Sequence, residues 1–339
     1  MEFDESAAFR MSESTSFLEF SGISTPYGVP SIGFTARNVM SAYYEYPRRM
    51  RTTKERAGIL AVLGAALCFG TTGTTQQLGV PDISPVAVAS ARLLCGSLFL
   101  FFFAYFQRKT RGDVRMPLLD LIICGSGIGM YQLTFFSAVH STGIAIATVT
   151  ALGAAPTLSA VVAYLVIKEK PQKSWYLGTA ITILGIVLVG TANGVQSFDP
   201  KGVGLAVLAG FGFAVFNVVC RKSLARGAQD MWLTATTFGV AALVSFPFLF
   251  TQNPEWIFTS KGFLTVLWLG LVTTSVGYVL FMFGLKRIES SKAATVVLAE
   301  PATATILAAV VIGEHLVFRS YLGIVIVALG ILSISRTKG

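Results

Sequence analysis

One acidic side chain interrupts a long apolar run near the C-terminal end of the sequence. Glu300 lies within residues 292–313, directly before Pro301. An ionisable group inside a membrane costs roughly 2.5–3.5 kcal/mol, so each one is a functional candidate. Pro301 lacks a backbone donor, which leaves a carbonyl oxygen free and loosens the helix. A carboxyl group at this point could bind a ligand ammonium group or carry a proton, and the alternative role is to fix helix packing.

Arg92 is a second ionisable side chain inside an apolar run, residues 86–106. It could contact an anionic ligand or act as a gate, and it could equally extend to the membrane surface or pair with Asp82. Uncharged polar and aromatic side chains in other apolar runs complete the set of candidate ligand contacts: Thr72, Gln76, Tyr131, Gln132, Asn217 and Tyr278. For the two tyrosines, anchoring of helix packing is the alternative.

Several common chemistries find no support in the sequence. The four cysteines lie in apolar runs without a CxxC pair, so we expect them to be packing residues, with neither a disulfide framework nor a zinc site. HExxH and Walker A motifs are absent, and the glycine-rich string at residues 125–129 lies inside an apolar run with no strand before it. We therefore expect no enzyme activity, no metal, no cofactor and no ATP-driven step.

The composition favours a membrane protein. Hydrophobic residues make up 53% of the 339 residues and charged residues only 13%, whereas soluble domains carry about 25% charged residues. The net charge of +9 does not indicate nucleic-acid binding, because the basic residues are scattered through short breaks between apolar runs.

Ten apolar runs are long enough to cross a membrane, for which a helix needs about 20 residues. They are residues 57–78, 86–106, 117–139, 143–167, 174–191, 202–220, 231–250, 262–285, 292–313 and 319–335. The sequence thus predicts an all-α polytopic membrane protein. Residues 1–56 contain no such run and are rich in Ser, Thr, Tyr and Gly before residue 50, so we expect a disordered cytoplasmic tail.

The basic residues predict the orientation of the ten helices. With the N-terminus in the cytoplasm, 20 Lys and Arg residues fall in inner segments and three in outer loops. Basic residues concentrate on the cytoplasmic side of membrane proteins. We therefore expect both termini to be cytoplasmic, and the short loops and the lack of organelle signals favour the inner or plasma membrane of a cell.

An internal repeat divides the apolar part into two halves, residues 57–191 and 202–335. Pro156 and Glu169 recur 145 residues later as Pro301 and Glu314, and the string at 60–63 recurs at 205–208. Tyr131 matches Tyr278 at an offset of 147, and Thr72 matches Asn217 at 145. Because each half has five helices, an odd number, the second half must be inverted in the membrane, as in many secondary transporters.

The repeated motif resembles a known family. Each half contains a Pro, a Glu thirteen residues later and two glycines in its last helix: Pro156, Glu169, Gly178 and Gly185, then Pro301, Glu314, Gly323 and Gly330. This pattern looks like the drug/metabolite transporter superfamily of the EamA type, whose members also often carry an Arg at the place of Arg92. The resemblance implies a ten-helix secondary carrier of amino acids, related metabolites or drugs, often moved outward. It also implies that helices 1, 3, 4, 6, 8 and 9 line a central cavity. Because proline lacks a backbone donor, we expect Pro156 and Pro301 to break their helices or act as hinges.

The leading hypothesis is therefore a secondary transporter that moves a small metabolite, with an amino acid or related amphipathic compound as the favoured solute and efflux as the favoured direction. Its expected partners are the solute, the lipid bilayer, and protons or another ion, while a homodimer is left open. The nearest alternative is a sugar-phosphate or nucleotide-sugar exchanger of the same superfamily, which should need more Lys or Arg in the cavity than Arg92 alone. A receptor or structural membrane protein is a third hypothesis, but neither explains an inverted duplication.

Overall fold

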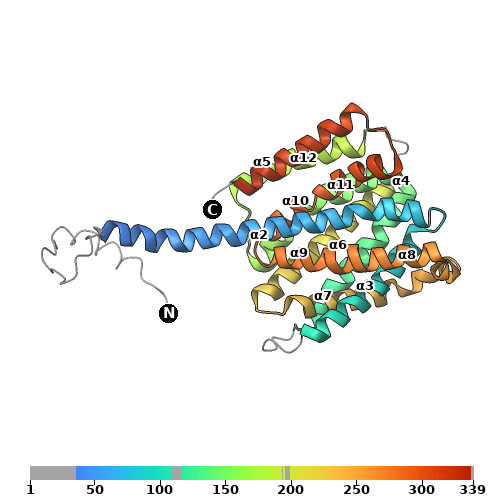
Figure 1. The fold of residues 1–339 in the computed structure, drawn as a ribbon, viewed down its shortest axis with the longest axis horizontal. Helices are drawn as coiled ribbons and strands as arrows, with labels where there is room; N and C mark the ends of the chain where they lie inside the picture. Colours follow the sequence, from blue (N-terminus) through green and yellow to red (C-terminus); the bar gives the residue numbers. More distant parts are fainter. Residues whose placement is uncertain (1–35, 108–115, 193, 195–198, 337–339) are drawn as a thin grey trace, which may run out of the picture. The chain divides into compact units, whose positions relative to one another are not determined.

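The structure, a computed structural model, describes residues 36–107, 116–192, 194 and 199–336, and none of these residues is in a β-strand. Backbone contacts divide the chain into Met1–Arg49 and Met50–Gly339, and the site lies in the second unit. Ten described helices are long and apolar enough to cross a membrane (Figure 1). They are Thr53–Gly79, Pro85–Gln107, Leu118–Gly143, Ala145–Ile167, Lys173–Gly190, Pro200–Ala225, Asp230–Thr251, Ser260–Leu285, Ser290–Ile312 and Phe318–Ser335. The prediction of ten spanning helices is confirmed.

The first half contains four helical elements: α2 (Ala36–Gly79), α3 (Pro85–Gln107), α4 (Leu118–Ile167) and α5 (Lys173–Gly190). The long α4 holds two spans, which meet at Gly143, where φ is 79° and ψ is 159°. Glycine adopts a positive φ at little cost, so the chain can change direction here without a loop. His140 is an exposed residue of α4, three residues before this turn.

The second half has the same order of spans but more interruptions. Its elements are α6 (Pro200–Ala225), α7 (Asp230–Ser245), η1 (Phe246–Thr251), η2 (Pro254–Phe258), α8 (Ser260–Trp268), the π-helical η3 (Leu269–Val276), α9 (Gly277–Leu285), α10 (Ser290–Val296), α11 (Ala299–Leu307), the π-helical η4 (Ala308–Ile312) and α12 (Phe318–Arg336). The ninth span is therefore broken between α10 and α11.

The two proline positions behave differently. Pro301 cannot donate to the carbonyl oxygen of Val297, which instead accepts from the Glu300 amide at 2.9 Å, and the chain turns at Val297 and Leu298. The predicted helix break is thus present beside Pro301. At Pro156, by contrast, α4 continues without interruption, and the expected break is wrong there.

Two pairs of matching helices from the two halves pack against each other. α5 contacts α12 and α3 contacts α7; Figure 1 shows α5 and α12 side by side along one edge of the bundle. A Cβ atom on Gly185 would lie 2.9 Å from the Gly323 carbonyl oxygen, and one on Gly178 would lie 3.1 Å from that of Gly330. These four glycines therefore serve close packing within one chain.

The N-terminal segment differs in part from the expectation. α2 begins at Ala36, so residues 36–56, which we predicted to be disordered, are helical. They contain helix formers such as Ala, Arg, Met, Lys and Glu, but also Pro47, which opposes a continuous helix. Residues 1–35, the remainder of the predicted tail, lie outside the described residues.

Candidate functional site

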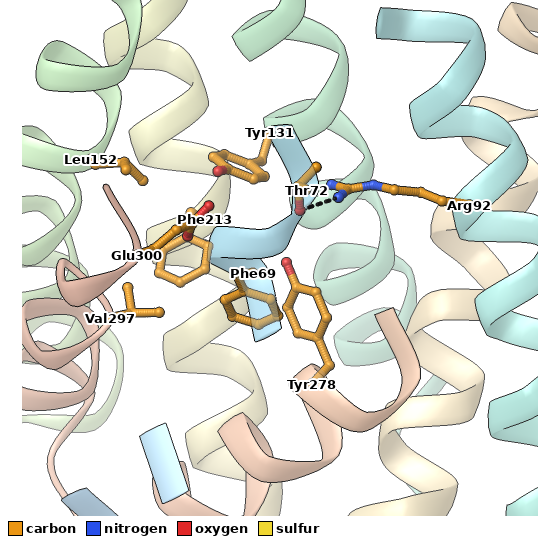
Figure 2. Close-up of a pocket in the computed structure, with 9 residues that line it drawn as sticks. All are labelled: Phe69, Thr72, Arg92, Tyr131, Leu152, Phe213, Tyr278, Val297 and Glu300. Carbon is orange, nitrogen blue, oxygen red and sulfur yellow. Dashed lines mark hydrogen bonds between the residues drawn. The ribbon is translucent and has the colours of Figure 1, made fainter. Parts of the chain in front are cut away.

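A pocket between the two halves brings most of the candidate residues together. Its lining comes from six helical elements and the break between α10 and α11: Phe69, Thr72, Arg92, Tyr131, Leu152, Phe213, Tyr278, Val297 and Glu300. Both matched tyrosines and both ionisable candidates are among them. Figure 2 shows Arg92 and Glu300 entering from opposite sides, with Thr72 between them.

Glu300 owes its position to the broken ninth span. It is the second residue of α11, directly after the turn at Val297 and Leu298. Its carboxylate accepts no hydrogen bond and forms no ion pair with any described residue. A half-buried carboxylate that faces a pocket without a partner can bind a cationic or hydrogen-bond-donating group.

Arg92 points into the pocket rather than toward Asp82 or the membrane surface. Its Nη2 donates to the Gln132 side-chain oxygen at 2.9 Å, and its Nη1 donates to the Thr72 hydroxyl at 3.4 Å. Of the alternatives for Arg92, pairing with Asp82 is not seen among the described residues. Gln132 is 2% exposed and lies behind the guanidinium as its hydrogen-bond partner.

Aromatic rings form the apolar wall of the pocket. The Tyr278 ring lies 4.7 Å from Phe69 and 4.3 Å from Phe238, measured between centroids. The Tyr131 ring lies 5.6 Å from that of Phe213. Rings at these separations pack favourably, and each tyrosine adds a polar tip that can meet a ligand.

The pocket is narrow in this conformation. The cavity volume is about 30 Å³, which is room for one or two water molecules. A solute as large as an amino acid therefore requires the lining helices to separate.

Three predicted contacts do not line the pocket: Asn217, Gln76 and Gln132, the last of which lies behind Arg92. Asn217 is fully buried, and its amide donates to the Ser290 carbonyl oxygen at 2.8 Å and to the Ser159 hydroxyl at 3.3 Å. Gln76 lies three residues before the end of α2, where its amide donates to the Ile83 carbonyl oxygen at 3.4 Å. The Asn217 amide thus joins α6 to α4 and α10, and the Gln76 amide contacts the loop that follows α2.

Sequence reasoning missed four lining residues: Phe69, Leu152, Phe213 and Val297. A signal for two of them was present. Leu152 and Val297 each precede a motif proline by four residues and match at the repeat offset of 145. They therefore occupy equivalent places on the two halves, so a lining role for one of them predicts a lining role for the other.

Ion pairs join the helices at one end of the bundle, which we call the basic end because most loop Lys and Arg residues lie there. Glu169 accepts from the Ser290 amide at 2.7 Å and pairs with Arg221 at 3.5 Å. Lys292 is 4% exposed and pairs with Glu55. Together these contacts tie α2, α4, α6 and α10 to one another.

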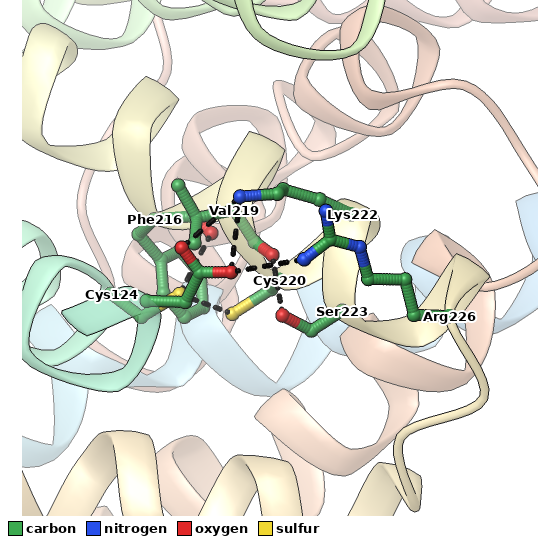
Figure 3. A network of polar contacts seen from close by, with 8 residues as sticks. Cys124, Phe216, Val219, Cys220, Lys222, Ser223 and Arg226 are labelled. Carbon is green, nitrogen blue, oxygen red and sulfur yellow. Dashed lines mark hydrogen bonds and ion pairs between the residues drawn. The ribbon is translucent and has the colours of Figure 1, made fainter. Parts of the chain in front are cut away.

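A second ionic group at the basic end joins α4 to α6. Asp120 pairs with Lys222 at 3.1 Å and with Arg226 at 3.6 Å. Figure 3 shows these two cations beside Cys124 and Cys220. At the opposite end, the repeat equivalents of Arg221 and Lys222 are the neutral Gln76 and Gln77. These two basic partners of the ion pairs are therefore present at the basic end only.

Comparisons with known proteins agree with this architecture. The model of the EamA-like transporter family matches residues 56–191 and again residues 200–336, one match for each half. The uncharacterized transporter YwfM of Bacillus subtilis is 35% identical over 278 residues, covering 81% of this chain and 93% of the relative. An uncharacterized transporter of Archaeoglobus fulgidus is 23% identical over 282 residues, covering 82% and 98%.

One solved crystal structure shares the fold. It superposes with a TM-score of 0.71 at 17% sequence identity and covers 82% of this chain and 98% of that protein. With two family matches over nearly the whole bundle, ten spanning helices and a pocket between the halves, the chain belongs to the EamA-like transporter family.

Proposed function

We propose that this transporter moves a small amphipathic metabolite, of the size of an amino acid, through the central pocket by alternating access. The observation that carries the proposal is the Glu300 carboxylate, which faces the pocket without a partner among the described residues. A solute ammonium group would compensate this charge. The rings of Phe69, Tyr278 and Phe213 would take the apolar part of the solute.

The arrangement of the halves supports alternating access. The lining comes from both repeats, and the ninth span is broken beside the pocket, where a few residues can absorb a change in backbone angles. Opening the basic end would require the ion pairs of Glu169 and Lys292 to separate. Their exposure to solvent when open would offset part of the lost attraction.

The proposed setting is the inner or plasma membrane of a cell, with both termini in the cytoplasm and efflux as the direction. The distribution of 20 against three loop basic residues supports this orientation. Glu300 is the group that would carry a coupling proton or meet another coupling ion. A sugar-phosphate or nucleotide-sugar exchanger has less support, because Arg92 is the one cation that lines the described pocket. A homodimer has no added support from the glycines, which pack within the chain.

Transport in proteoliposomes tests the proposal. Vesicles are loaded with a panel of amino acids, nucleosides, sugars and toxic amphiphiles, and efflux is measured with and without a proton gradient. We expect Glu300→Gln to lower flux of the transported solute at least tenfold without lowering the melting temperature. Glu314→Gln is the matched control, because Glu314 is an exposed carboxylate outside the pocket. Unchanged flux in Glu300→Gln would remove Glu300 from transport, and no flux of any solute through well-folded protein would refute the transport mechanism.

A further inference from the structure

Arg92 is a charged group without a charged partner. Among the described residues no ion pair includes it, and its hydrogen bonds go to two neutral side chains, Thr72 and Gln132. Its Nε–H is buried and has no hydrogen-bond partner in the part of the chain that the structure describes. A guanidinium inside the membrane normally pairs with an acid or faces a water-filled cavity. The one acid that lines the same pocket, Glu300, lies beyond ion-pair distance.

Gln132 fixes the direction of the guanidinium and has a donor to spare. Its side-chain oxygen accepts from Arg92 at 2.9 Å, and this contact determines that its Nε2 group faces away from Arg92. Nε2 is buried and has no partner. An unsatisfied buried donor is costly, so the free Arg92 Nε–H indicates that an acceptor belongs beside the guanidinium.

We propose that Arg92 binds the carboxylate of the solute, with Gln132 as the residue that positions the guanidinium and Thr72 beside it. This inference rests on the proposed function and adds the charge pattern of the solute. A carboxylate matches the planar fork of a guanidinium and would satisfy its free donor. A phosphate dianion fits less well, since the lining supplies a single cation.

The positions of Arg92 and Glu300 then orient the solute. They enter the pocket from opposite sides (Figure 2), so a carboxylate at Arg92 leaves an amino group free to reach Glu300. A solute that carries both charges compensates both side chains at once. Binding is therefore expected to discriminate against analogues that lack either charge.

Thermal stabilisation of the purified transporter tests the carboxylate subsite. The probes are alanine, leucine and phenylalanine, each with its amide, which lacks the carboxylate, and its deamino acid, which lacks the ammonium group. A ligand that binds the folded state raises the melting temperature according to its concentration and Kd. We expect at least one amino acid to stabilise the protein and its amide to bind at least tenfold more weakly.

Two variants separate the subsite from general effects on folding. Gln132→Glu places a carboxylate beside Arg92, so we expect a higher melting temperature without ligand and loss of the preference for acid over amide. Gln76→Glu is the control, since it adds the same charge to α2 outside the pocket. Arg92→Lys keeps the charge but not the fork, so we expect weaker binding of the acid and unchanged binding of the amide.

Three results would overturn the inference: equal binding of acid and amide, a full preference for acid in Gln132→Glu, or no stabilisation by any acid of the panel. The proposed function is tested separately by Glu300→Gln. If amides bind as well as acids and both lose affinity in Glu300→Gln, the transport proposal stands and the carboxylate subsite falls.

Discussion

The end of α4 allows a stability effect to be worked out from the repeat. Lys168 follows this helix with φ 57° and ψ 22°, the one described non-glycine residue with a positive φ. Its equivalent in the second half is Gly313, with φ 81° and ψ 21°. In both halves the amide of the following glutamate reaches back 3.3 Å to a carbonyl oxygen, of Ala163 in the first and Ala308 in the second. The left-handed residue therefore closes the same type of helix end twice.

Lys168→Gly should stabilise the transporter. A left-handed conformation costs an L-residue about 1–2 kcal/mol, while glycine adds about 0.5–1 kcal/mol of flexibility to be lost on folding. The expected net gain is therefore about 0.5–1 kcal/mol. The Lys168 ammonium also lies 5.5 Å from the centre of the Tyr164 ring, an exposed contact whose loss reduces the gain.

Lys170→Gly is the matched control. Its ammonium lies 5.6 Å from the same Tyr164 ring, but its φ is not positive. This variant loses the ring contact and gains flexibility without relief of strain, so we expect it to be destabilised by about 0.5–1 kcal/mol. The difference between the two variants, about 1–2 kcal/mol, isolates the backbone effect.

The assay is thermal unfolding in detergent at one fixed scan rate, because such unfolding is often irreversible. A difference of 1 kcal/mol corresponds to about 1–2 °C for a chain of this length. Gly313→Lys should lower the melting temperature by a similar amount. The reasoning fails if Lys168→Gly melts no higher than Lys170→Gly, or if Gly313→Lys melts like the unmodified protein.

Three further predictions concern packing and charge. Diamide should cross-link Cys124 and Cys220, whose sulfur atoms lie 3.2 Å apart on α4 and α6, and mass spectrometry of the peptides should find this pair and no link through Cys68 or Cys95. Burial and the nearby Glu169 carboxylate raise the pKa of Glu289, so the contribution of Glu289 to stability falls as pH rises above 4.5. Glu289→Gln should therefore flatten the pH dependence of the melting temperature between pH 4 and 8. An unchanged slope would contradict this prediction. Gly185→Leu should destabilise the protein by about 1–3 kcal/mol, because a Cβ there would lie 2.6 Å from the Val327 nitrogen. Gly204→Ala is the control and should not destabilise the protein, because a Cβ at Gly204 meets open space. Equal melting temperatures of the two variants would refute the α5–α12 packing.

The sequence by itself determined the number of spans and the repeat. A spanning helix must satisfy its own backbone hydrogen bonds and present about 20 apolar residues to lipid, so each span is a local property of the chain. Glu300 and Arg92 were recognisable for the same reason, since a charge stands out in an apolar run. The matched tyrosines followed from the repeat offset.

Only the tertiary structure decided which matched residues reach the pocket. Thr72 and Asn217 occupy the same repeat position, yet Thr72 lines the pocket, whereas the Asn217 amide donates hydrogen bonds to Ser159 and Ser290. The two halves carry different neighbours at equivalent places, so equal positions acquire different partners. Lipid-facing helices are apolar on most sides, and their periodicity therefore does not fix which side faces inward.

The same limit explains the prolines and the glutamines. Pro156 and Pro301 are equivalent in sequence, but of these two described residues only the second adjoins a helix break, while α4 continues through the first. Gln76 and Gln132 are both amides in apolar runs, but they differ in their distance from Arg92: Gln132 hydrogen-bonds Arg92, whereas Gln76 donates to Ile83. That distance depends on how α2, α3 and α4 pack together, a property of the assembled bundle rather than of any one segment.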